Sequence, residues 1–297
     1  MMYRRMINII LGTSAMTLLL FGNSILAQDI DEIIVWNRLL DNPAAYKILQ
    51  RALENSREEF GDYQLTMSSP MEQGRVEREL MKNKRVHVAN FAPSVERETR
   101  LLPIRMPVTK GMLGMRVCLI KKGSQAKFDA ISSKEQWQQA GLTIGQGTHW
   151  PDTPILKHNG LSVVTSNNYH SLFAMLDKQR FDCFSRSITE VLAEQEMHDK
   201  NGFEIEHHLL LVYPLPTFFF VSRDNPKLAA RIEKGLTAAV DNGSLNDLIK
   251  TDYADTFKRL KIDSRQIIYL DNPFLSKQTQ ALIRQRKFWL TPTVDAK

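Results

Sequence analysis

The spacing of apolar positions alternates between strand-like and helix-like runs from the start of the chain. The run "EIIVW" at 32–36 is continuously apolar after its first residue and predicts a buried strand, whereas Tyr46, Leu49 and Leu53 recur at the spacing of one helical face. Up to residue 91 the pattern predicts strands at 32–36, 63–67 and 86–91 and helices at 43–60 and 71–82. This order is the βαβαβ half-unit of an open parallel sheet.

Two proline-marked breaks, at 102–107 and 213–226, interrupt the alternation. Between them a second α/β series is expected, with strands at 111–120, 142–145, 161–165, 180–185 and 204–211 and helices at 134–140, after Thr148, at 169–178 and at 188–199. Helices at 227–242 and 245–260 and an extension at 261–297 follow the second break. The chain thus leaves its first unit and later returns to it.

The expected fold class is therefore α/β with two lobes, each an open, mostly parallel sheet flanked by helices, joined by a two-strand hinge. The expected boundaries are 28–108 with 214–260 for lobe 1, 109–213 for lobe 2, and 261–297 for a C-terminal extension packed on lobe 1. Ligands of open α/β sheets bind beyond the carboxyl ends of the strands, so two facing sheets predict a cleft that closes on a hinge.

The first residues predict export. Arg4 and Arg5 precede an apolar run at 7–21, and small and polar residues lead to Ala27, which is the pattern of a cleaved secretory signal peptide at 1–27. The alternative is an uncleaved membrane anchor. Since the first cysteine is Cys118, the segment is not that of a lipoprotein, and a periplasmic location is expected. The net charge of +6 is interspersed, which excludes the basic stripe of a nucleic-acid-binding protein.

The chain has two cysteines, Cys118 and Cys183, both on expected strands of the second series. In an oxidising compartment they could form a disulfide. Two buried free thiols are the slightly favoured alternative.

Several kinds of chemistry are excluded by the motifs. "GQGTHW" at 145–150 lacks the third glycine of a dinucleotide fingerprint, and no Gly-Lys-Ser/Thr or Gly-x-Ser-x-Gly is present. His207 and His208 are adjacent on an expected strand, so their rings point to opposite faces and do not share a metal. No cofactor, metal or catalytic residue is expected.

Three stretches carry a resemblance to a known family: "APSVERE" (92–98), "LTIGQGT…DKQRFDCFSRS" (142–187) and "LPTFFFVSRDNPKLAARIEKGLTAAVDNGSL" (215–245). Their order resembles that of the periplasmic solute-binding proteins of the polar amino acid class. The resemblance covers about residues 30–260 and implies a type II periplasmic-binding-protein-like fold. It also implies a receptor that serves an ATP-driven (ABC) importer.

The resemblance implies lobe 1 ligand residues. Its Thr-Pro-Glu-Arg stretch aligns with 94–97, so Ser94 and Arg97 are candidates to hold a ligand carboxylate, a group that a guanidinium grips bidentately. Arg97 could instead be a solvated residue of the run "ERETR". Trp36 falls near the family's covering aromatic ring, with ordinary core packing as the alternative.

The resemblance also implies lobe 2 residues. Gly147 and Thr148 match the turn whose backbone N–H groups meet the carboxylate. Trp150 could shape the pocket or pack under the turn, and Tyr169 could face the cleft. The family's amine-binding aspartate is replaced by Ser187, preceded by Arg186, which disfavours a standard α-amino acid and favours an anionic ligand or the loss of ligand binding.

The expected function is a monomeric periplasmic binding receptor that closes on a small, carboxylate-bearing solute and presents it to a membrane permease. The first alternative is a signalling accessory that reports the ligand to a sensor protein, with 261–297 as a docking surface. The second is an enzyme similar to cyclohexadienyl dehydratase, for which Glu96 and His149 are the only tempting acid–base groups.

Overall fold

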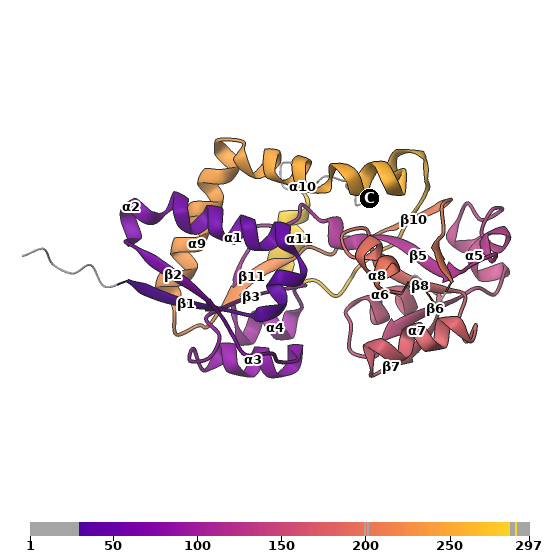
Figure 1. Ribbon diagram of the computed structural model, residues 1–297, viewed down its shortest axis with the longest axis horizontal. Coiled ribbons are helices and arrows are strands. Elements are labelled where there is room, and N and C mark those ends of the chain that lie inside the picture. The colour runs from indigo at the N-terminus through magenta and orange to yellow at the C-terminus, as the bar shows by residue number, and fades with distance from the viewer. Residues whose placement is uncertain (1–29, 199, 201, 286–288, 290–297) are drawn as a thin grey trace, which may run out of the picture.

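The computed structural model describes residues 30–198, 200, 202–285 and 289. The expected signal peptide and its cleavage after Ala27 lie outside these residues and stay predictions. In the described part of the chain, no helix combines the length and the apolar character that crossing a membrane requires. The molecule is elongated, with one helix-flanked sheet toward each end (Figure 1). We call the unit of the first sheet lobe 1 and that of the second sheet lobe 2.

The sheet of lobe 1 has five strands in the order β2-β1-β3-β11-β4. β1 pairs in parallel with β2 and β3, and β11 runs antiparallel between β3 and β4. The strands are β1 (Asp31–Val35), β2 (Tyr63–Met67), β3 (Val88–Phe91), β4 (Leu102–Ile104) and β11 (Phe218–Val221). The helices are α1 (Pro43–Asn55), α2 (Arg57–Phe60), α3 (Gln73–Met81), α4 (Val95–Arg100) and α9 (Pro226–Asp241), with a 3-10 turn at Asn37–Asp41.

The helices α1 and α9 pack closely because Gly235 lies at their contact. A Cβ atom on Gly235 would come within 1.7 Å of the Ala52 carbonyl oxygen. The apolar faces of both helices are buried, and the two helices cover one side of the sheet. The carboxyl ends of β1 and β3 point toward lobe 2 (Figure 1).

The sheet of lobe 2 has seven strands, in the order β12-β10-β5-β8-β6-β7 with β9 also paired to β5. β6 is parallel to β7 and β8, whereas β5 runs antiparallel to its neighbours. The strands are β5 (Met115–Lys121), β6 (Thr143–Gly147), β7 (Ser162–Ser166), β8 (Cys183–Ser187), β9 (Phe203–Ile205), β10 (Leu209–Val212) and β12 (Gln266–Tyr269). The helices are α5 (Lys134–Gln139), α6 (Asp152–His158), α7 (Tyr169–Asp177) and α8 (Val191–Met197).

Two segments cross between the lobes side by side, 105–114 outward and 213–217 on the return. Val108 N donates to Thr217 O at 2.9 Å and Tyr213 N donates to Gly114 O at 3.1 Å. Gly114 is required at this contact, because a Cβ atom there would lie 1.9 Å from the Tyr213 carbonyl oxygen. The predicted fold class, two α/β lobes joined by a two-strand hinge, is confirmed.

The expectation of free thiols is wrong. Cys118 on β5 and Cys183 on β8 form a disulfide with a Cα–Cα distance of 5.0 Å. The reason is topological: β5 and β8 are neighbours in the sheet, and this brings the two Cα atoms within the range that a disulfide spans.

The C-terminal extension differs from the expectation that it packs on lobe 1. After α10 (Ser244–Leu260), β12 joins the sheet of lobe 2 in parallel with β10. Only the part around α11 (Lys277–Ile283) returns to lobe 1, where Thr279 contacts Glu98. The expected strand at 204–211 is also divided, since His207 and His208 lie in a bend between β9 and β10.

Candidate functional site

Arg97 lies on α4, just beyond the carboxyl end of β3 in lobe 1. Its Nε and Nη2 atoms donate to Glu77 Oε1 on α3, at 3.2 and 2.6 Å, and its Nη1 atom donates to the Ala92 carbonyl oxygen. The guanidinium carbon sits 4.8 Å from the centre of the Phe91 ring. The side chain is only 11% exposed. Arg97 is thus held in one position, and the alternative of a freely solvated residue does not hold.

Ser94 caps α4, where its hydroxyl oxygen accepts a hydrogen bond from the Arg97 backbone N–H at 3.1 Å. This cap fixes the first turn of the helix and thereby the start of the Arg97 side chain. Ser94 therefore lies beside Arg97, as the resemblance implies.

Trp36 follows β1 but packs in the core. Its side chain is 6% exposed, its ring lies 5.3 Å from that of Phe91, and its Nε1 atom donates to the Met71 carbonyl oxygen at 3.1 Å. Trp36 therefore supports Phe91, the ring beneath the Arg97 guanidinium, and the core-packing alternative describes it.

Arg186 lies on β8 inside a cage of rings and carboxylates in lobe 2. Its Nε and Nη2 atoms donate to the two carboxylate oxygens of Glu194 on α8, both at 2.6 Å, and Nη2 is 2.9 Å from Glu190 Oε2. The guanidinium carbon is 4.7 Å from the centre of the Trp150 ring and 5.1 Å from that of Phe184. The rings hold the guanidinium by cation–π contacts and the glutamates by charge.

The cage shifts the ionisation of its members. Burial alone would lower the pKa of Arg186, but the charges of Glu190 and Glu194 more than offset it, so the pKa is raised. Burial would raise the pKa of Glu194, yet the Arg186 charge and its hydrogen bonds lower it. Tyr169 donates to Glu194 Oε1 at 2.7 Å, and burial together with this carboxylate raises the pKa of the phenol. All three side chains therefore keep their ordinary charge near neutral pH.

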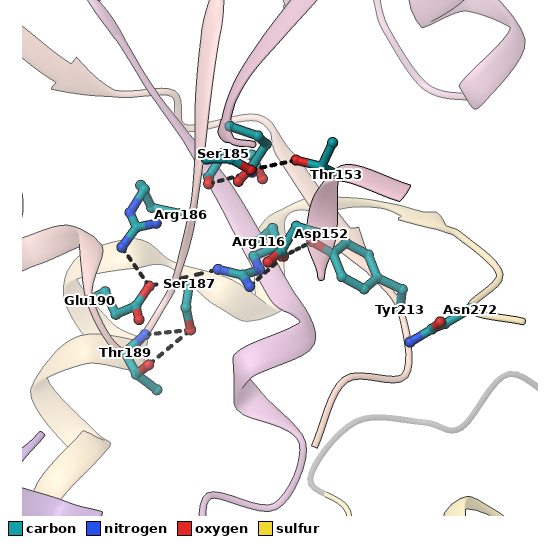
Figure 2. A network of polar contacts seen from close by, with 12 residues as sticks. Arg116, Asp152, Thr153, Ser185, Arg186, Ser187, Thr189, Glu190, Tyr213 and Asn272 are labelled. Carbon is teal, nitrogen blue, oxygen red and sulfur yellow. Dashed lines mark hydrogen bonds and ion pairs between the residues drawn. The ribbon is translucent and has the colours of Figure 1, made fainter. Parts of the chain in front are cut away.

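A second buried arginine, Arg116 at the start of β5, extends the network. It forms an ion pair with Asp152 on α6, and the Tyr213 hydroxyl donates to the same carboxylate. Glu190 Oε2 lies 3.7 Å from Arg116 Nη1 as well as beside Arg186, so that it joins the two arginines (Figure 2). Because Glu190 is 39% exposed, it is the part of this network that meets solvent.

The turn after β6 is closed by Trp150. Its ring lies over Gly147, where a Cβ atom would come within 2.6 Å of the indole, and it stacks with Phe184 at 6.2 Å. Thr148 is exposed, but its backbone N–H donates to the Ser166 carbonyl oxygen at 3.0 Å. The Trp150 ring therefore packs against the turn at Gly147, and the Thr148 backbone N–H already forms a hydrogen bond within the sheet.

Ser187 is fully buried at the end of β8. Its hydroxyl contacts Thr189 Oγ1 at 2.9 Å and donates to the Met112 carbonyl oxygen at 3.2 Å. The structure thus brings Trp150 and Tyr169 together around Arg186, separately from the Ser94 and Arg97 pair in lobe 1. Gly147 leaves room for the Trp150 ring, and Ser187 is buried in the core.

Sequence reasoning missed the carboxylates that hold both arginines: Glu77, Glu190 and Glu194. Glu77 and Glu194 lie on helices and Glu190 lies at the N-cap of α8, where a glutamate read from the sequence looks like part of a solvated face. A signal did exist for Arg116, which is a single charge within the apolar run "MRVCLI", since a buried arginine needs a counter-ion.

The two acid–base candidates from the sequence both lie at the surface of the protein. Glu96 pairs with Arg100 at 2.6 Å on the surface of α4 and is 70% exposed, and His149 is exposed. Within residues 30–198, 200, 202–285 and 289, no three His, Cys, Asp or Glu side chains form a group that could hold a metal ion.

Solved structures share this fold. An ancestral arginine-binding protein bound to glutamine superposes with a TM-score of 0.52 at 17% identity, covering 74% of this chain and 96% of its own. The periplasmic VFT2 domain of BvgS from Bordetella pertussis gives 0.54 at 14%, covering 75% and 92%. A periplasmic His/Glu/Gln/Arg/opine family-binding protein from Silicibacter pomeroyi, in complex with lysine, gives 0.52 at 8%, covering 74% and 95%.

No family model matches the chain, and no curated protein matches it. At these identities the structural likeness shows the fold alone. The chain has the two-lobed architecture of periplasmic binding proteins, and its site must be judged from its own residues.

Proposed function

We propose that this protein is a periplasmic binding receptor that holds a small, carboxylate-bearing solute between its two lobes, at Arg97. The receptor closes on the solute and presents the closed form to a membrane partner, either a permease or a sensor protein. Solved binding proteins share the fold, which supports the binding role.

The proposal rests on the N–H donors of the Arg97 guanidinium that have no partner among the described residues. A guanidinium has five N–H donors, and the hydrogen bonds to Glu77 and Ala92 use one on each nitrogen. One N–H on each terminal nitrogen is left among the described residues. A guanidinium whose two terminal nitrogens each keep an N–H can bind a carboxylate through both of them.

Glu77 and Phe91 also prepare this fork for binding. Since they already fix the guanidinium, a solute does not have to order a free arginine side chain, which favours affinity. The pair of Arg97 and Glu77 is neutral overall. A solute with a carboxylate for Arg97 and a positive or hydrogen-bond-donating group near Glu77 would match it better than a simple dianion.

Lobe 2 contributes in a different way. Arg186 already pairs with two carboxylates, with Glu194 through two hydrogen bonds and with Glu190 at 2.9 Å, so a solute carboxylate would meet two negative charges beside it. In the closed form lobe 2 would cover the solute with the exposed turn at Thr148 and His149 and with the half-exposed Glu190.

A thermal-shift screen of the mature protein tests this function. Amino acids, keto acids, dicarboxylates and small peptides are added singly, and a solute at 100 times its Kd should stabilise the fold by about 2.7 kcal/mol. The Arg97→Ala variant should lose this stabilisation.

Arg100→Ala is the matched control, because Arg100 lies on the same helix and forms only an exposed pair with Glu96. It should respond to solutes like the wild type. A stabilising solute that acts equally on wild type and Arg97→Ala would contradict the assigned site, and a screen with no stabilising solute would contradict the function.

A further inference from the structure

Residues 244–283, comprising α10, β12 and α11, connect the two lobes outside the hinge. We call this segment the strap. In Figure 1, α10 runs along the top of the view from lobe 1 to lobe 2, and α11 lies back beside lobe 1. The chain therefore passes between the lobes four times: through 105–114, 213–217, the end of α10 leading to β12, and 270–276.

The helix α10 is anchored on both lobes. On the side of lobe 1, Lys47 Nζ donates to Asp252 at 2.9 Å and the Tyr253 hydroxyl donates to Asn42 Oδ1 at 3.1 Å. On the side of lobe 2, Arg259 Nη2 donates to Glu196 Oε1 at 3.0 Å. A helix of 17 residues is about 25 Å long, so a single stiff element spans the gap.

The strap is fixed to lobe 2 by β12 and its flanking residues. All four residues of β12 pair with β10 in parallel register. The buried Arg265 guanidinium donates to the carbonyl oxygens of Glu206 and Leu209, at 2.6 and 2.8 Å. Asn159 and Asp271 exchange two hydrogen bonds, at 2.8 and 3.0 Å. This attachment cannot slide without leaving buried polar groups unpaired.

The return to lobe 1 ends on a buried carboxylate, Glu98. Ser276 Oγ donates to Glu98 Oε2 at 2.8 Å, and Thr279 Oγ1 donates to Glu98 Oε1 at 2.9 Å. Glu98 is 5% exposed and also accepts from Arg105 at 2.9 Å, next to the outward hinge segment. On the way, Asn272 Nδ2 donates to the Pro214 carbonyl oxygen of the returning hinge segment at 2.7 Å.

We infer that the strap limits the opening and closing rotation of the lobes, so that the protein keeps a narrow range of interlobe angles even without a solute. A two-strand hinge rotates by changing a few backbone dihedral angles. Here a large rotation must bend α10 or break a buried anchor at Glu98 or Arg265, so the closure proposed above is a small one. The inference bears on the receptor proposed above but does not depend on its solute.

Spin-label distances between the lobes test the strap directly. Labels are attached at Arg78→Cys on lobe 1 and Lys178→Cys on lobe 2, both exposed positions, and the distance distribution is measured by double electron–electron resonance without any added solute. The labelled wild type should give one narrow distribution. Ser276→Ala with Thr279→Val, which removes both donors to Glu98, should give a broader one.

Thr237→Val is the matched control, since its hydroxyl bonds only within α9, to Glu233. It should leave the distribution unchanged. Should the Ser276/Thr279 variant fail to fold, Asn272→Ala, which removes the donor to the Pro214 carbonyl oxygen, replaces it and should also broaden the distribution. A broad or two-peaked wild-type distribution would overturn the inference, as would a folded release variant indistinguishable from wild type. Neither result depends on the thermal-shift screen.

Discussion

The two lobes each place an arginine over a phenylalanine ring at the carboxyl end of a sheet, but they neutralise it differently. Arg97 of lobe 1 has one carboxylate partner, Glu77, whereas Arg186 of lobe 2 has Glu194 on two atoms and Glu190 beside it. The pair of Arg97 and Glu77 is neutral overall, whereas the two glutamates beside Arg186 outweigh its single positive charge. The comparison teaches that an arginine at a family-like position suits a ligand carboxylate only when carboxylates of its own chain do not outnumber it.

The lobes also differ in how they are cross-linked. Lobe 2 contains the disulfide between Cys118 and Cys183 and receives β12 from the strap, while the sheet of lobe 1 has neither. The stability of lobe 2 is therefore expected to depend on constraints in the unfolded chain, and that of lobe 1 on packing such as the contact of α1 with α9.

The largest effect is expected from removing the disulfide. Its closed loop has a sequence separation of 65 residues, for which the loop entropy corresponds to about 4 kcal/mol. The Cys118→Ala, Cys183→Ala double variant should lose about this much stability in denaturant unfolding. Hydrogen exchange should quicken in β5, β6 and β8 while β1 and β3 keep their protection. Equal loss in both lobes would mean that they unfold as one unit.

Arg186→Ala should have the next largest effect. The substitution leaves the buried Glu194 without its counter-ion, and breaking a buried pair costs about 3 kcal/mol or more. Arg97→Ala should cost clearly less, since Glu77 is 22% exposed and gains solvent when its partner is lost. Urea unfolding of both variants measures the difference, and added guanidinium-type cations should partly restore Arg186→Ala only. An equal cost for the two arginines would remove the distinction between the lobes.

Most of the fold could be predicted from the sequence because each lobe repeats local signals. The strand–helix periodicity and the proline breaks mark both sheets, and a chain that leaves and returns requires two crossings. The strand β12 could not be found in this way, since "QIIY" is short and its partner β10 lies more than 50 residues earlier. Pairing over such a separation is decided by the assembled sheet and not by local pattern.

The candidate site could be predicted only for residues whose role follows from position. Ser94 and Arg97 lie together because a capped helix start places them there. The roles of Glu77, Glu190 and Glu194 arise only when α3, α8 and the turn before α8 pack beside arginines on other elements. A buried ion pair joins residues from separate elements, as Arg186 on β8 and Glu194 on α8 show, and the glutamate taken alone is typical of a solvated helix face.

The smallest expected effect concerns the acid titration of Glu194 in lobe 2. The Arg186 charge lowers the pKa of Glu194 in the folded protein, so its contribution to stability is fully present above the ordinary carboxyl pKa, about 4.3, and is lost as the pH falls through the lower folded value. Glu194→Gln lacks this ionisation. Its stability deficit against wild type, measured by urea unfolding between pH 7 and pH 3, should therefore shrink on acidification.

Glu196→Gln serves as the control, because Glu196 lies on the same helix but pairs with Arg259 at the surface and is 63% exposed. Its small difference from wild type should change little with pH, since exposed pairs contribute little to stability. If the deficit of Glu194→Gln stayed constant down to pH 3, the carboxylate charge would not be what holds Arg186. The network of lobe 2 would then depend on neutral hydrogen bonds, and the contrast with Arg97 would rest on packing alone.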